Sequence, residues 1–180
     1  MVRVRKDVPA TLRRFFFRLD GQLPAASVDI TVRPVTSPND YRLAALERII
    51  EADALRRAGT LVMSMYISGV AAECMLRAYR KAGRLFDERH DLIELLRSCD
   101  LERLGVAGFR RLREPVQLAH LLWWSGLRFA HEGMARQRLR RMRAVAGRLP
   151  RAADFLKVRC NQLGEACREI VDVGAERWTT

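Results

Sequence analysis

The segment 59–83, GTLVMSMYISGVAAECMLRAYRKAG, constrains the fold more than any other part of the chain. It contains no proline, and its alanine, leucine, methionine, glutamate and arginine residues favour a helix. Apolar side chains occur on nearly every face of that helix, so most of its surface requires neighbouring elements. Mostly small residues recur at steps of three and four, which predicts the close approach of a second helix: Thr60, Ser64, Ser68, Ala71, Met75, Ala78 and Ala82. We therefore expect the segment to be the central helix.

Other helices are predicted on both sides of this segment. Ser37, Pro38 and Asp40 form a helix start signal, with Ser37 as the N-cap. The helix that follows ends near residue 57 and carries one apolar stripe, made of Leu43, Leu46, Ile50 and Ala54. It should form an antiparallel hairpin with the central helix. Further helices are expected at 88–99, 109–124, 134–149 and 151–173, with Pro115 near an internal break. The predicted fold is an all-α bundle of about five to six helices over residues 39–180.

Residues 1–38 differ from the rest and are predicted to form an N-terminal arm. Four of the six prolines of the chain fall here, and residues 27–33 alternate in a strand-like pattern. A strand requires a partner edge, which another subunit or another protein would supply. The apolar side chains of Phe15, Phe16, Phe17 and Leu19 also favour burial. The arm is therefore interpreted as an interface segment, with a mobile tail as the alternative.

The bulk composition limits the classes of function. Lysine and arginine number 33 against 21 acidic residues, which gives a net charge of +12 and favours polyanionic partners such as RNA. No uncharged apolar run approaches the roughly 18 residues of a membrane span, so no membrane association is expected. The four cysteines are scattered without metal-binding spacing, which predicts reduced thiols, no metal, no cofactor and a cytoplasmic location. No phosphate-binding loop or nucleophile elbow occurs.

Two motifs resemble the HEPN family of prokaryotic helical domains. The segment AAECMLRA, which contains Glu73 and Cys74, is similar to an alanine-rich helix of that family, and His90-Asp91-Leu92 to its next helix start. Trp124, Arg128 and Phe129 resemble a later element. The resemblance covers residues 40–147. It implies a dimerising bundle of a toxin–antitoxin or phage-defence system, acting either as a metal-independent ribonuclease or as a partner of a nucleotidyltransferase.

Ribonucleases of this family share an arginine and a histidine separated by four to six residues, contributed by both subunits of a dimer. Arg128 and His131 lie in the matching region with only two residues between them, and on a helix they would share a face. Arg113 and His120 match the spacing but enclose Pro115. Cleavage of RNA without a metal requires a proton acceptor and a cation at the phosphate, which histidine and arginine provide. We take Arg128 and His131 as the predicted catalytic pair.

Several other residues have candidate roles. Glu73 precedes Arg77 by four residues, which predicts a local ion pair or a role in orienting a catalytic arginine. His90 is a candidate supporting residue beside a helix start. The clearest predicted nucleic-acid surface is a row of guanidinium groups about one turn apart: Arg136, Arg140 and Arg143.

Two functional hypotheses follow. The protein is a ribonuclease or RNA-binding toxin subunit with Arg128 and His131 at a dimer seam, or a non-catalytic adaptor that uses the same basic surface to hold an acidic partner protein. The departure from the family spacing disfavours the first, and the arm favours the second. We prefer the RNA-associated hypothesis and keep the adaptor as the alternative.

Overall fold

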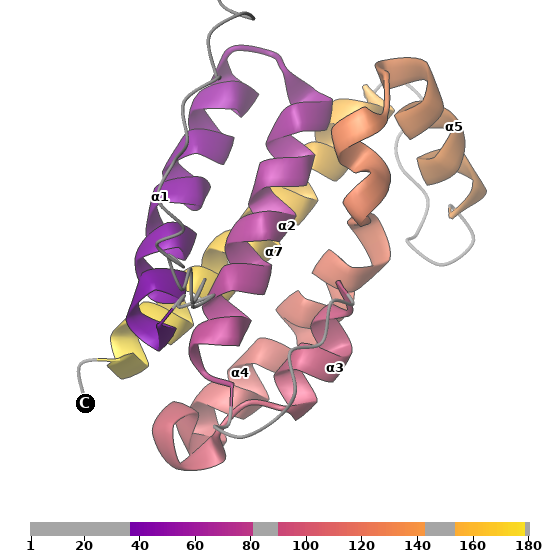
Figure 1. Cartoon of the computed structure of the whole chain (residues 1–180). Helices are drawn as coiled ribbons and strands as arrows, with labels where there is room; N and C mark the ends of the chain where they lie inside the picture. The colour runs from indigo at the N-terminus through magenta and orange to yellow at the C-terminus, as the bar shows by residue number, and fades with distance from the viewer. Residues whose placement is uncertain (1–36, 81–89, 143–153, 179–180) are drawn as a thin grey trace, which may run out of the picture. The chain divides into compact units, whose positions relative to one another are not determined.

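The computed structural model describes residues 37–80, 90–142 and 154–178. These residues contain six α-helices and one 3-10 helix and no strand, which confirms the predicted all-α class (Figure 1). The elements are α1 (Pro38–Arg57), α2 (Leu61–Ala78), α3 (Leu92–Arg97), α4 (Leu101–Leu122), η2 (Ser125–Phe129), α5 (Glu132–Arg141) and α7 (Phe155–Trp178). The strand and phenylalanine cluster predicted for the N-terminal arm lie outside the described residues.

Helix α1 begins where the sequence predicts. The Ser37 hydroxyl accepts a hydrogen bond from the Asp40 N–H at 3.1 Å, and the Asp40 carboxylate accepts one from the Ser37 N–H at 2.8 Å. This capping box satisfies two amide groups that a helix start otherwise leaves unpaired. After Arg57 the chain turns at Gly59, whose φ of +79° suits glycine, and returns as α2. The two helices form the predicted hairpin (Figure 1).

The apolar stripe predicted for α1 is wrong for three of its four residues: Leu43, Ile50 and Ala54 are exposed, and Leu46 packs against the core. Ala45, Ile49 and Ala52 are buried instead, whereas Leu43 is 44% exposed and Ile50 is 65% exposed. Small residues decide the orientation, because they let α1 approach α2 closely enough for the Ser64 hydroxyl to donate to the Ala52 carbonyl at 2.8 Å. Leu43 and Ile50 consequently face away from the bundle, whereas Ile49 is buried and Leu46 packs against the core.

Helix α7 packs against α1, α2 and α4, and in Figure 1 it runs behind α2. Its predicted core residues Leu156, Cys160, Leu163, Cys167 and Ile170 are all buried. At its C-terminal end the Tyr79 hydroxyl donates to the Gly174 carbonyl at 2.6 Å. A side chain at Gly174 would meet the Met75 sulfur at 2.4 Å, so glycine permits this contact between α7 and α2.

Helix α4 begins earlier than predicted, at Leu101, and its irregularity lies at Gly105 rather than at Pro115. Gly105 has φ +74° and ψ 152°, a conformation open essentially to glycine. Pro115 is buried within the helical part of α4. Hence two helical segments meet at Gly105, and residues 109–122 continue without the expected break.

Helix α2 is shorter than the predicted central helix and ends at Ala78, while residues 81–89 lie outside the described part. Among the described helices, α2 alone is long and apolar enough to cross a membrane by length and composition. In the folded protein, 61% of that helix is buried. A helix in the core of a protein can have the same length and apolar composition, and α2 contacts α1, α3, α5, α7 and η2.

Candidate functional site

A buried ion pair forms the base of the candidate site. Glu73 and Arg77, one turn apart on α2, are each only 7% exposed. The Glu73 Oε1 atom accepts from Arg77 Nε at 2.8 Å and lies 2.7 Å from Arg77 Nη2. The predicted ion pair is therefore confirmed. Arg77 holds the carboxylate in one orientation and occupies a single one of its oxygens.

The second oxygen of Glu73 contacts His90, which lies just before α3. Glu73 Oε2 is 2.8 Å from His90 Nδ1, and the His90 side chain is 46% exposed. Because the arginine-paired carboxylate only accepts hydrogen bonds, Nδ1 carries the proton of this contact. The lone pair of a neutral imidazole then lies on Nε2. A buried carboxylate that orients an exposed imidazole is the arrangement of a general base.

Trp123 supports His90 from another side. The two rings meet edge to face, with centroids 6.0 Å apart and planes at 83°. Trp123 is 5% exposed, and its Nε1 donates to the Tyr66 carbonyl at 3.1 Å. A Cβ atom at Gly69 would lie 2.1 Å from the indole, so glycine on α2 makes room for it. Trp123 thus acts as a buried support of the site, while Trp124 is half-buried.

A second imidazole lies at the same end of α3. His120 Nδ1 on α4 is 3.6 Å from Asp91 Oδ1, and Asp91 immediately follows His90. Asp91 also caps α3 by accepting from the Ile93 and Glu94 N–H groups. Both histidines are therefore anchored at the N-terminal end of α3, and both side chains are more than 40% exposed.

Arg113, Gln117 and His120 recur at steps of four and three and share one face of α4. Arg113 and Gln117 also line a hollow of about 230 Å³ between α3 and α4. The walls of this hollow are otherwise apolar apart from Arg97, which has only a 3.6 Å ion pair with Glu94. The lining residues are Ile93, Leu96, Arg97, Phe109, Arg113, Val116 and Gln117.

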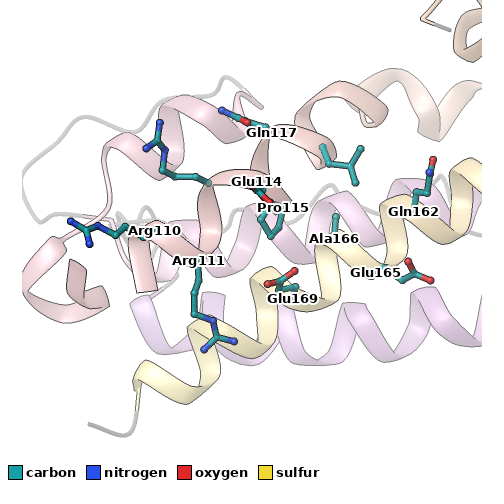
Figure 2. A pocket seen from close by; sticks show the side chains of 11 residues that line it. Arg110, Arg111, Glu114, Pro115, Gln117, Gln162, Glu165, Ala166 and Glu169 are labelled. Atoms are coloured by element: carbon teal, nitrogen blue, oxygen red, sulfur yellow. The ribbon is translucent and has the colours of Figure 1, made fainter. Parts of the chain in front are cut away.

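A larger groove, of about 1020 Å³, lies between α4 and α7. Figure 2 shows Arg110 and Arg111 on the α4 side and Glu165 and Glu169 on α7. Arg111 Nη1 lies 3.0 Å from Glu176 Oε2, so Arg111 already has an ion pair. Charges of both signs line this groove, so it lacks the uniformly positive surface that suits a phosphate backbone.

The predicted pair of Arg128 and His131 does not share a helix face. Arg128 belongs to η2, Ala130 has an extended conformation, and His131 is the N-cap of α5. Both side chains are exposed, and the Arg128 guanidinium lies 4.6 Å from the Phe129 ring centroid. His131 Nδ1 accepts from the Met134 N–H at 3.4 Å, which leaves its Nε2 protonated in the neutral form. His131 is therefore oriented as a donor rather than as a base.

The predicted arginine row is only partly available to a ligand. Arg136 contacts Glu132 Oε1 at 2.6 Å and Asp154 Oδ1 at 2.9 Å. The hydrogen bond from Arg136 lowers the pKa of Asp154, and the two carboxylates raise the pKa of Arg136, with Asp154 contributing most. Arg140 is exposed, and Arg143 lies outside the described residues. Arg136 is thus engaged in ion pairs within the protein.

The sequence indicated Glu73 and His90 separately but not their contact, since the two residues are 17 positions apart and belong to no common local pattern. The seven-residue spacing of Arg113 and His120 was the one local feature of the sequence that placed them on the same face of α4. Among the described residues no group of three or more histidine, cysteine or acidic side chains could hold a metal ion. Comparisons of the chain with protein-family models, curated proteins and solved structures give no match.

Proposed function

We propose that this protein is a HEPN-like, RNA-associated endoribonuclease of a toxin–antitoxin or phage-defence system that acts without a metal. We assign the acid–base chemistry to His90 and His120 and a positioning role to Glu73. The observation that carries the proposal is the 2.8 Å contact between the buried Glu73 carboxylate and the exposed His90 imidazole.

The reaction is a transfer within the RNA backbone. His90 Nε2 accepts the proton of a 2′-hydroxyl, whose oxygen then forms a bond to the adjacent phosphorus. The bond from phosphorus to the 5′-oxygen breaks, and protonated His120 gives its proton to that leaving oxygen. The products are a 2′,3′-cyclic phosphate and a 5′-hydroxyl. Histidine suits both steps because it exchanges protons near neutral pH.

The surroundings of the two histidines support an RNA substrate. The hollow between α3 and α4 combines apolar walls with Arg97 and Arg113, which suits a nucleobase stacked beside a phosphate. Arg113 is exposed, and no ion pair of its side chain is found among the described residues. The net charge of +12 favours association with a polyanion of any sequence.

The test is cleavage of end-labelled RNA by the full chain, with and without a chelator. We expect chelator-resistant cleavage, cyclic phosphate ends, and no cleavage where a 2′-deoxynucleotide replaces the target. His90→Ala and His120→Ala should each lower the rate by about 100-fold or more, the usual contribution of an acid–base group. Both side chains are exposed, so the variants should keep the helical circular dichroism of the parent.

His131→Ala is the matched comparison, since His131 is the third of the three histidines of the chain. A large rate loss in His131→Ala or Arg128→Ala, with His90→Ala unaffected, would contradict the assignment and favour the pair predicted from the sequence. A lower kcat in Glu73→Gln with an unchanged KM for RNA would support positioning of His90 by the carboxylate.

The second candidate function is a non-catalytic adaptor that binds an acidic protein, such as a nucleotidyltransferase of the same defence system. It is favoured by the engagement of Arg136 with Glu132 and Asp154 and by the separation of Arg128 and His131 into two elements. Absence of cleavage at every ratio of protein to RNA, together with a stable complex with the product of the neighbouring gene, would support the adaptor.

A further inference from the structure

The surface formed by η2 and α5 combines aromatic rings with arginine side chains that lie over them. The Arg128 guanidinium is 4.6 Å from the Phe129 ring centroid, and the Arg138 guanidinium is 4.3 Å from the ring centroid of Trp124. Phe129 is 76% exposed, more than any other large apolar residue that the structure describes. We call these four residues the η2–α5 platform.

The local backbone holds both rings of the platform in place. Leu127 of η2 is buried, whereas the two residues that follow it, Arg128 and Phe129, are exposed. The Trp124 indole lies beside the same short helix, because a Cβ atom at Gly126 would be only 3.1 Å from it. Rings that are already held in place lose little conformational freedom when a ligand stacks on them.

The platform also lies in a strongly positive part of the chain. Residues 124–142 contain five arginines and one acidic residue, Glu132, whose carboxylate is paired with Arg136. For the other four arginines no ion pair is found among the described residues: Arg128, Arg138, Arg140 and Arg141. Guanidinium groups pair with phosphates, and their flat faces stack on aromatic rings and bases alike.

We propose that the η2–α5 platform binds unpaired nucleotides of the RNA strand that the histidine site cleaves. Successive bases stack on the rings and on the guanidinium planes above them, while the neighbouring arginines contact the phosphates. The bases of a duplex are already paired and stacked on one another, so their faces are not open to the platform. The inference rests on the proposed ribonuclease and narrows its substrate to RNA that is single-stranded beside the cleaved bond.

The platform adjoins the histidine site through two consecutive tryptophans. Trp123 contacts the His90 ring, and Trp124 is the first residue of the platform. Consecutive Cα atoms are about 3.8 Å apart, so the support of His90 and the platform are covalent neighbours. Both tryptophans have an extended backbone, which directs their side chains to opposite sides of the chain. One tryptophan is therefore used for packing and the other for the surface.

The aromatic rings favour a nucleic acid over an acidic protein as the ligand. Carboxylates of a protein would pair with the arginines alone and gain nothing from the open face of Phe129. Every nucleobase, in contrast, has a flat face that stacks on such a ring, whatever its sequence.

The test is the affinity of the full chain for a short fluorescent strand of deoxyadenosines, measured by fluorescence anisotropy at one fixed salt concentration. This strand has no 2′-hydroxyl, so binding is observed without cleavage. We expect the dissociation constant to be about tenfold higher for the same strand in a duplex. Phe129→Leu keeps an apolar side chain but removes the ring, and should also raise it about tenfold, whereas Phe129→Trp should not raise it. Arg138→Lys keeps the charge but removes the guanidinium plane, and should raise it about threefold.

Ile50→Ala is the matched control for Phe129→Leu, because Ile50 is a large apolar residue that is 65% exposed on α1. Arg57→Lys, also on α1, is the control for Arg138→Lys. Equal weakening by a control and its platform variant would overturn the proposal, as would a duplex that binds as tightly as the single strand. Polyglutamate that binds more tightly than the strand, with no effect of Phe129→Leu, would also overturn it and point to an acidic partner protein.

The platform and the ribonuclease chemistry can fail separately in these measurements. Strand binding that depends on Phe129, without cleavage of any RNA, would support the platform and contradict the ribonuclease. Cleavage that depends on His90, with strand binding that Phe129→Leu leaves unchanged, would overturn the platform alone. All four substituted side chains are exposed, so the variants should keep the helical circular dichroism of the parent.

Discussion

Gly69 and Trp123 illustrate how single residues place the candidate site. The indole occupies the space that any side chain at position 69 would fill, and it contacts His90 on its other edge. A methyl group at position 69 would therefore act on His90 through Trp123. This contact joins α2 to the end of α4, two segments far apart in the chain.

We expect Gly69→Ala to lower the free energy of unfolding by about 1–3 kcal/mol, the usual cost of overpacking a core. It should also change the tryptophan emission, because Trp123 must move away from Tyr66. Gly164→Ala is the matched control: its Cβ would have only one neighbour within 4 Å, at 3.9 Å, and alanine favours a helix more than glycine does. Urea unfolding of both variants tests this, and equal stabilities would contradict it.

At the residue scale the sequence predicted only local contacts. The ion pair of Glu73 with Arg77 follows from one-turn spacing and was predictable. The contacts of His90 with Glu73 and with Trp123 join residues from separate elements. Their positions depend on how three helices pack, which no local pattern specifies.

At the scale of elements, the start of α1 was predictable because its signal is local chemistry. The hydrogen bonds from Ser37, chiefly the side-chain one, lower the pKa of Asp40 below its usual 3.8. A carboxyl whose pKa is lower in the folded state stabilises the fold above the unfolded pKa, and this contribution is lost as the pH falls below about 4.

Ser37→Ala should therefore lower the free energy of unfolding by about 1 kcal/mol at pH 7, the usual effect of losing an N-cap. The difference from the parent should shrink between pH 4 and pH 3, because the contribution of the Asp40 carboxylate is lost as the pH falls through its lowered pKa. Urea unfolding monitored by circular dichroism at these pH values measures both quantities. A difference that grows toward acid pH would contradict the role given to Asp40.

The orientation of elements was less predictable than their existence. On α1 the face with Ala45, Ile49 and Ala52 is buried in place of most of the predicted stripe, and its two alanines let α1 approach α2 closely. Likewise Pro115 is a stronger helix-breaking signal than Gly105, yet Gly105 has the non-helical backbone. Both errors arise because packing between helices overrides the preference of single residues.

At the scale of the whole molecule, the pKa values of the four cysteine thiols indicate how far packing excludes water from them. Burial raises the pKa of Cys74 to about 11 and that of Cys99 to about 12, and it raises the pKa of Cys160 and Cys167 as well. All four are free thiols. In the unfolded chain these groups ionise near pH 9, so only unfolding releases their protons in mildly alkaline solution.

Because the folded-state pKa values of the thiols are raised, their contribution to stability should be constant between neutral pH and about pH 9 and fall above it. Each protected thiol contributes a slope of about 1.4 kcal/mol per pH unit once its unfolded form is ionised. Urea midpoints between pH 8 and pH 10.5 measure the total slope, and Cys99→Ala should reduce it by the share of one thiol. A slope that Cys99→Ala leaves unchanged would contradict this account.

The hydrogen bond from Tyr79 to Gly174 spans 95 residues. During translation α2 therefore leaves the ribosome long before α7 exists to cover it. Until then the apolar face of α2 that α7 covers stays exposed in the emerging chain, where chaperones would recognise it. A premature stop codon before residue 155 would leave that face permanently exposed, and such a fragment should be cleared by proteolysis or aggregate rather than persist as a smaller version of the protein.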